Sequence, residues 1–93
     1  MITAPLFPTE IVLPILHLNG DRATTLLTRL ESAVTAVAAA LDALQATAPN
    51  GRNYYPVPGQ LERATQQHTA RKEHLQHVFH SLMAEIRGIQ DLA

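Results

Sequence analysis

The chain has no cysteine and no tryptophan among its 93 residues. Without cysteine, neither a disulfide framework nor a thiolate metal site can form. An excess of either charge is also missing, since seven Lys and Arg residues stand against eight Asp and Glu residues. Nonspecific binding of long nucleic acid would need a clearly basic surface, so the composition argues against that class of protein.

A long hydrophobic run is absent as well. Because no charged N-terminal region leads into such a run, we expect neither a signal peptide nor a membrane-spanning segment. The expected compartment is therefore the cytoplasm, and the expected partners do not include a membrane.

Catalytic signatures are also lacking. There is no P-loop, no dinucleotide-binding glycine pattern and no pair of carboxylates on one helical face. Neither Ser32 nor Ser81 lies in a nucleophile elbow. We expect no enzyme activity, no catalytic residue and no cofactor.

The chain length predicts a single domain, 1–93, with a thin core, because so short a chain buries only about 60–65% of its unfolded surface. Its first part, 1–20, is an apolar N-terminal arm interrupted by Pro5, Pro8 and Pro14. Proline removes a backbone donor and restricts the preceding residue, so we expect an extended or irregular arm. Its apolar side chains need a surface to cover, either on the rest of the chain or on a second subunit.

The sequence predicts two helices, and the first spans residues 21–48. Asp21 is placed to cap or line its N-terminus, where negative charge is favourable. Apolar residues recur at spacings of three and four, which is the pattern of one helical stripe. The stripe comprises Leu27, Leu30, Val34, Val37, Leu41, Leu44 and Ala48. A second face comprises Ala33, Ala36, Ala39, Ala40, Ala43 and Ala46. This alanine face reflects either helix propensity alone or the close approach of another helix.

Residues 58–92 predict the second helix, and 49–57 the turn that joins the two. The short connection makes the helices antiparallel. The apolar stripe of the second helix is Leu75, Phe79, Leu82, Ile86, Ile89 and Ala93. Two helices cannot cover both stripes, so the predicted fold is all-α: a long antiparallel helical hairpin that assembles into a helical-bundle homo-oligomer, a dimer or higher.

The turn contains most of the chemistry. Asn50-Gly51 has a backbone that is able to adopt a positive φ, which exposes N–H groups. Arg52 has a planar set of five donors that suits phosphate or carboxylate, and Tyr54 and Tyr55 have faces on which a base can stack. In an alternative interpretation, the tyrosines fold back over the helix ends and Arg52 caps carbonyls of the first helix. A third interpretation is contact with a protein partner.

Basic residues cluster at the turn end, and the start of the second helix is polar where its later part is apolar. His68 and Arg71 lie on this polar section. A small anionic ligand of nucleotide size would suit these groups better than a long nucleic acid.

His74, His77 and His80 recur every three residues, which brings them close together on a helix. This is not an HExxH pattern, and facing acidic ligands are missing, so solvated or subunit-contacting histidines are the preferred interpretation over a metal site. His17 differs because it lies in an apolar stretch before Asn19-Gly20.

Two motifs, His17-Leu18-Asn19-Gly20 and Asn50-Gly51-Arg52-Asn53-Tyr54-Tyr55-Pro56, resemble those of a group of small tailed-bacteriophage proteins with HLNG and an NGRDYYP-type turn. The resemblance covers about residues 15–89, and this chain has Asn53 where that turn has aspartate. It implies a phage accessory protein in the cytoplasm of the infected bacterium. By analogy, such proteins resemble the "sponges" that sequester cyclic nucleotide immune signals.

The sequence therefore predicts a homo-oligomer that binds a nucleotide-derived immune signal, of the cyclic oligonucleotide or cyclic ADP-ribose type, without cleaving it. His17 and Asn19 would complete the site, from the same or a neighbouring subunit. The expected ligand-binding residues are Arg52, Tyr54, Tyr55, Asn50, Asn53, Arg71, His68, His17 and Asn19. The alternative is a protein-interaction or structural module that docks a host or virion protein through the turn and the alanine face.

Overall fold

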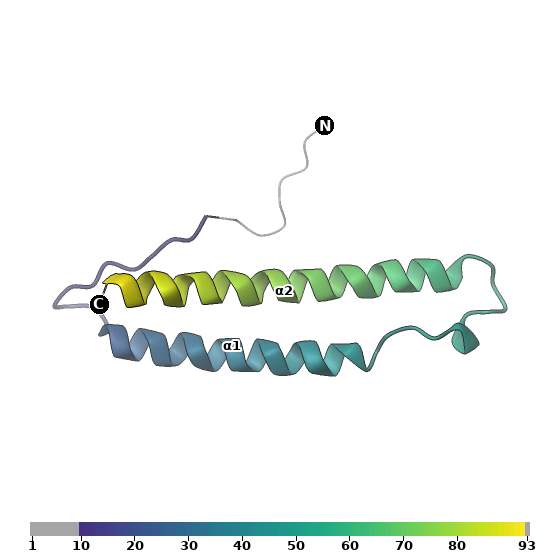
Figure 1. Cartoon of the computed structure of the whole chain (residues 1–93), viewed down its shortest axis with the longest axis horizontal. Helices are drawn as coiled ribbons and strands as arrows, with labels where there is room; N and C mark the ends of the chain where they lie inside the picture. The colour runs from purple at the N-terminus through teal and green to yellow at the C-terminus, as the bar shows by residue number, and fades with distance from the viewer. Residues whose placement is uncertain (1–9, 93) are drawn as a thin grey trace, which may run out of the picture.

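The computed structural model describes residues 10–92, and within that range all regular structure is helical. The order is α1 (Ala23–Gln45), a short 3-10 helix η1 (Gly51–Asn53) and α2 (Gln60–Leu92). The two long helices run antiparallel and pack against each other along their length (Figure 1). This confirms the all-α helical hairpin.

The hairpin is elongated. Its longest dimension is 63 Å and its radius of gyration is 18.3 Å, whereas a compact domain of this length would have a radius of about 12 Å. The antiparallel direction of the helices follows from the short connection. Within residues 10–92, no third long helix packs on the pair. The result is two helices that each cover only one side of the other.

The core is correspondingly small. Among the apolar residues of the described range, only Ile86 and Ile89 are buried, and α1 has no buried residue. The α1 stripe, from Leu27 to Leu44, does face α2 but stays half-exposed. The stripe was thus correctly predicted as the contact face, and one partner helix leaves it incompletely covered.

The start of α1 differs from the prediction. Arg22 is the N-cap and makes no side-chain cap hydrogen bond. Asp21 is not the cap, because its carboxylate pairs instead with Arg29 Nη1 at 3.0 Å. Charge pairing across two helical turns therefore takes the carboxylate that the backbone N–H groups would otherwise attract.

The end of α1 tightens rather than continuing to residue 48. The N–H groups of Ala46, Thr47 and Ala48 each donate to the carbonyl three residues earlier, at 2.9 to 3.2 Å. Such bonds are typical of a helix terminus that passes into a 3-10 turn. Pro49 follows, and the helix does not resume.

At the other side of the turn, α2 begins two residues later than predicted, at Gln60 rather than Pro58. Gly59 has φ 84°, a value that residues with a side chain rarely adopt. The Gly59 carbonyl accepts the N–H of Arg63 at 3.2 Å. The chain therefore turns at Gly59 before the helix starts.

Residues 10–20 of the N-terminal arm contain no helix or strand, as predicted, and run back along the C-terminal part of α2 (Figure 1). A Cβ atom added at Gly88 would lie 2.5 Å from Leu13 Cδ2, so the leucine side chain lies directly over this glycine. Val12, Ile15 and Leu18 are 78, 84 and 102% exposed. Residues 10–20 thus pack on the hairpin through Leu13 and leave Val12, Ile15 and Leu18 exposed.

The alanine face points away from α2. Ala36, Ala39, Ala40 and Ala43 are exposed, and Ala33 is half-exposed. Neither long helix in residues 10–92 has the length and apolar character needed to cross a membrane.

Candidate functional site

The tip of the hairpin is held by a set of local hydrogen bonds. Asn50 Oδ1 accepts the backbone N–H of Arg52 at 2.9 Å and so caps η1. The Gly51 carbonyl accepts the N–H groups of Tyr54 and Tyr55 at 3.1 and 3.0 Å. Asn50-Gly51 does not adopt the positive φ that its sequence allows, and within the described residues only Gly59 has one. The Asn50 side chain stabilises the turn in its place.

The two tyrosines have different surroundings. Tyr54 is half-buried, and Tyr55 is 81% exposed. A Cβ atom at Gly51 would lie 3.7 Å from Leu61 Cδ2, so the connector lies against the first turn of α2. The interpretation that the tyrosines fold back over the helix ends therefore fits Tyr54, which is half-buried. It does not fit Tyr55, whose ring is exposed to solvent.

Arg52 is exposed at the tip. Within residues 10–92 the single ion pair joins Arg29 to Asp21, and the Arg52 side chain makes no hydrogen bond there. It does not cap α1. That role belongs to Thr47, whose hydroxyl donates to the Leu44 carbonyl at 2.7 Å.

No acidic residue occurs between Asp42 and Glu62. The connector therefore has Arg52 as its one charged side chain. In the first turn of α2, Glu62 is followed by Arg63, and Arg71 and Lys72 lie further along the helix. A carboxylate nearby would neutralise the guanidinium and repel an anion. The tip is thus an electrostatically favourable place for an anionic group.

His68 is not at the surface. It is 7% exposed, the lowest value of any polar side chain in the described range. Its Nδ1 lies 3.5 Å from Thr47 Oγ1. The Thr47 hydroxyl also donates to the Leu44 carbonyl, so one side chain contacts both the end of α1 and the His68 ring. His68 thus joins the end of α1 to α2, and its ring is covered.

Arg71 is exposed on α2, ten residues beyond Leu61. That separation corresponds to about 15 Å along the helix axis. Asn53 is exposed on η1 itself. The structure therefore groups Asn50, Arg52, Asn53, Tyr54 and Tyr55 closely at the tip and places Arg71 further along the same half of the molecule.

His17 and Asn19 lie at the opposite end of the hairpin, before the start of α1 (Figure 1). His17 Nδ1 accepts the Asn19 N–H at 3.3 Å, and the His17 carbonyl accepts the Gly20 N–H at 3.1 Å. His17 also lines a shallow pocket of about 520 Å³. Within one chain, these residues and the tip cannot contact the same ligand.

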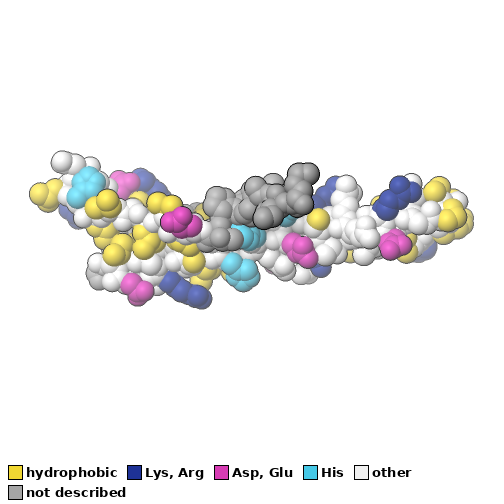
Figure 2. Space-filling model, turned by 90° about the horizontal axis from the view of Figure 1, so that it is seen from above, with side chains coloured by type: hydrophobic (Ala, Val, Ile, Leu, Met, Phe, Trp, Pro, Cys, Tyr) yellow, Lys and Arg dark blue, Asp and Glu magenta, His cyan; other side chains and the backbone are white. Residues whose placement is uncertain are grey.

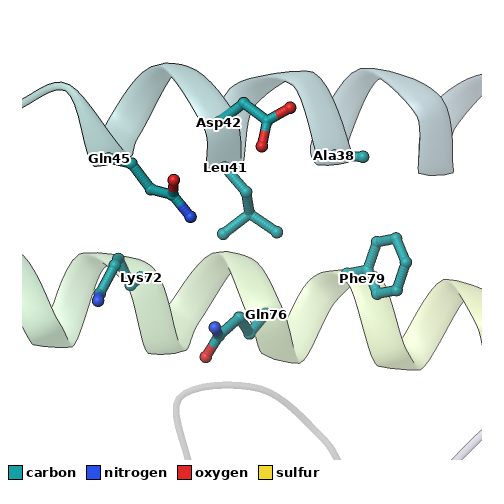
Figure 3. A pocket seen from close by; sticks show the side chains of 7 residues that line it. All are labelled: Ala38, Leu41, Asp42, Gln45, Lys72, Gln76 and Phe79. Atoms are coloured by element: carbon teal, nitrogen blue, oxygen red, sulfur yellow. The ribbon is translucent and has the colours of Figure 1, made fainter.

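A groove between the helices was not predicted. Its volume is about 310 Å³, and Figure 3 shows its lining side chains on the two facing helices. The lining residues are Ala38, Leu41, Asp42, Gln45, Lys72, Gln76 and Phe79. The sequence does contain a signal for it, since Gln45, Lys72 and Gln76 interrupt the apolar stripes where the helices meet. Small and flexible side chains at that level leave space between the helices.

The histidine series on α2 does not form a metal site with other groups. Within residues 10–92, no group of three or more His, Asp or Glu side chains is arranged to hold a metal ion. His77 is half-buried, while His74 and His80 are exposed. The His80 ring contacts Phe79 edge-on, with ring centroids 5.6 Å apart.

Comparison of the chain with protein-family models, with curated proteins and with solved structures finds no match.

Proposed function

We propose that this protein is a homo-oligomeric binding protein that holds a nucleotide-derived anion at the tip of the hairpin and does not cleave it. Arg52 would neutralise a phosphate, and Tyr55 would stack on a base. Asn53 and the Tyr54 hydroxyl would supply hydrogen bonds, while Asn50 and His68 keep the connector in place. Arg71 would contact the outer part of an extended ligand.

One observation carries the proposal: an exposed arginine and an exposed tyrosine lie three residues apart on a hydrogen-bonded tip without carboxylates. Tyr55 is 81% exposed, and the Arg52 side chain makes no hydrogen bond or ion pair within residues 10–92, so both are accessible to a ligand. Stacking and charge-assisted hydrogen bonds are the two contacts that a nucleotide offers. The tip therefore suits a nucleotide better than an uncharged or cationic ligand.

The phage-type motifs narrow the expected ligand class. HLNG and the NGRNYYP turn resemble those of small phage proteins, so the proposed ligand is a cyclic oligonucleotide or a cyclic ADP-ribose type of immune signal. Tight binding without turnover would lower the free concentration of that signal in the infected bacterium. Host antiviral defence would then be inhibited by sequestration.

Isothermal titration calorimetry against cyclic di- and trinucleotides and cyclic ADP-ribose isomers tests this proposal. We expect binding to at least one of them, and Arg52→Ala should weaken it at least tenfold, since a charged hydrogen bond contributes about 1.5–3 kcal/mol. Arg87→Ala is the matched control, because Arg87 is exposed on α2 at the far end. No heat with any ligand at micromolar protein, or equal losses for the two variants, would refute the proposal.

The second candidate is a protein-interaction module. The exposed alanine face and the half-covered α1 stripe favour it, because both are surfaces on which a further helix could pack. One stoichiometric protein captured from infected-cell lysate, and lost on Tyr54→Ala, would support this candidate. A small ultraviolet-absorbing molecule that co-purifies and leaves on heating would support the nucleotide proposal.

A further inference from the structure

The hairpin carries opposite net charge at its two ends. In the turn half, residues 46–72 contain four basic side chains and one acidic side chain. At the open end, residues 10–31 and 85–92 together contain three basic side chains and five acidic ones. Two copies aligned in parallel would bring like charge to each end, whereas an antiparallel pair brings unlike charges together.

Both ends also expose apolar side chains, and Figure 2 shows hydrophobic groups at each end of the face it draws. At the open end these are Val12, Ile15 and Leu18 of the arm, together with Leu92. At the turn end they are Tyr55, Val57 and Leu61, which are 81, 51 and 40% exposed. The two patches lie at opposite ends of one chain, so they cannot cover each other within it.

The accessible surface area of the chain is larger than that of a compact monomer of the same mass. The chain exposes 7344 Å², whereas a compact monomer of this size would expose about 5,300 Å². The excess is larger than the roughly 800 Å² that each partner buries in a standard protein interface. A second copy is the one occupant that offers both the apolar patches and the complementary charges in the same arrangement.

We propose that two copies associate antiparallel, about a twofold axis perpendicular to the hairpin, with the arm of each copy seated on the turn end of the other. Residues 12–18 of one chain would cover Val57 and Leu61 of its partner, and the contact would occur twice. This inference rests on the self-association in the proposed function but does not depend on ligand binding. It also brings His17 of one copy close to the tip of the other.

Cysteine cross-linking tests the arrangement, because the natural chain has no cysteine. Ile15→Cys and Val57→Cys are made separately, mixed in equal amounts and oxidised with glutathione disulfide. We expect a disulfide-linked dimer in the mixture and little in either variant alone. Ala39→Cys mixed with Val57→Cys is the control, since exposed Ala39 is 16 residues into α1, about 24 Å from its start, and a disulfide needs Cα atoms within about 7 Å.

The double variant Ile15→Cys/Val57→Cys tests closure. Its two cysteines lie at opposite ends of one chain, so they cannot pair within it. A closed twofold dimer stops at a dimer band, whereas a head-to-tail array gives a ladder, which would overturn the proposal.

Three other results would overturn it. A disulfide between two copies of Ile15→Cys would show a parallel pair. A dimer in sedimentation that fails to cross-link in the mixture would show that the arm does not contact the turn. A monomer at all concentrations would show that the chain does not self-associate. Calorimetry of the unmodified chain reports on ligand binding separately, so failure of the arrangement and failure of the nucleotide proposal give different results.

Discussion

At the scale of single residues, Asn50 stabilises the tip through one short bond to the backbone of Arg52. We expect Asn50→Ala to lower the free energy of unfolding by about 1 kcal/mol, the usual cost of a lost cap. Urea denaturation measures it. Asn53→Ala is the matched control, because Asn53 is exposed and its side chain makes no hydrogen bond within residues 10–92. Equal effects of the two substitutions would contradict the capping role.

His68 and Thr47 form the polar contact between the end of α1 and α2. We expect His68→Ala to lower the free energy of unfolding by about 1–3 kcal/mol, because it empties a buried position and removes a polar partner of Thr47. A double-mutant cycle with Thr47→Val should give a small coupling of about 0.5 kcal/mol, because the 3.5 Å separation is long. Coupling above about 2 kcal/mol would show a tighter contact than the structure has.

The surroundings of individual side chains were the features that the sequence predicted least well. Helical spacing put His68 on the polar face near the turn, but it could not show that the ring is buried and lies within 3.5 Å of Thr47. The same limit applies at Asp21, where spacing permits either a cap or a pair with Arg29. Periodicity predicts which face of a helix a side chain lies on. It does not predict which of several possible partners that side chain will bind.

At the scale of elements, the arm and α2 meet at Gly88. The sequence contained a signal here, because a glycine inside a helix costs about 1 kcal/mol relative to alanine and so calls for a packing reason. The reason is Leu13, which lies over the glycine. The direction of the arm could not be predicted, since an irregular segment has no periodicity.

We expect Gly88→Ala to loosen the arm while leaving α2 helical, because the new Cβ would require Leu13 to move. Losing part of one leucine contact, about 1 kcal/mol, corresponds to roughly fivefold faster chymotrypsin cleavage after Leu16 or Leu18. In a Leu13→Ala background, Gly88→Ala should have no further effect. Faster cleavage in that background as well would point to a change in α2 itself.

The two helices themselves were predicted to within three residues at each described end. The apolar stripes give the helical period, and Pro49 and Pro58 bound the turn between the helices. The errors at Arg22, Gln45 and Gln60 lie at helix ends. There, local hydrogen bonds and ion pairs decide where the helix begins or ends, and the apolar stripe does not. For the candidate site, the sequence correctly grouped the tip residues in one connector. It could not place His17 and Asn19, since their distance from the tip depends on the length of the hairpin.

At the scale of the whole molecule, burial within one chain is thin, so the proposed association would contribute to the stability of the fold. If the second copy covers the α1 stripe, unfolding is coupled to dissociation, so the melting temperature should rise with protein concentration. Calorimetric scans over a hundredfold concentration range measure this. A constant melting temperature across a range in which sedimentation shows dissociation would mean that the hairpin is stable alone.

The unequal length of the helices has one more consequence. With 33 residues against 23, α2 extends beyond α1 by about 15 Å, and among residues 10–92 it is the connector that lies against that overhang. Segments with few apolar contacts are the first to open locally, so amide hydrogens in the first turns of α2 should exchange with solvent faster than those near Ile86 and Ile89. The tip would then be the least protected part of the molecule, and a ligand bound there would slow that exchange.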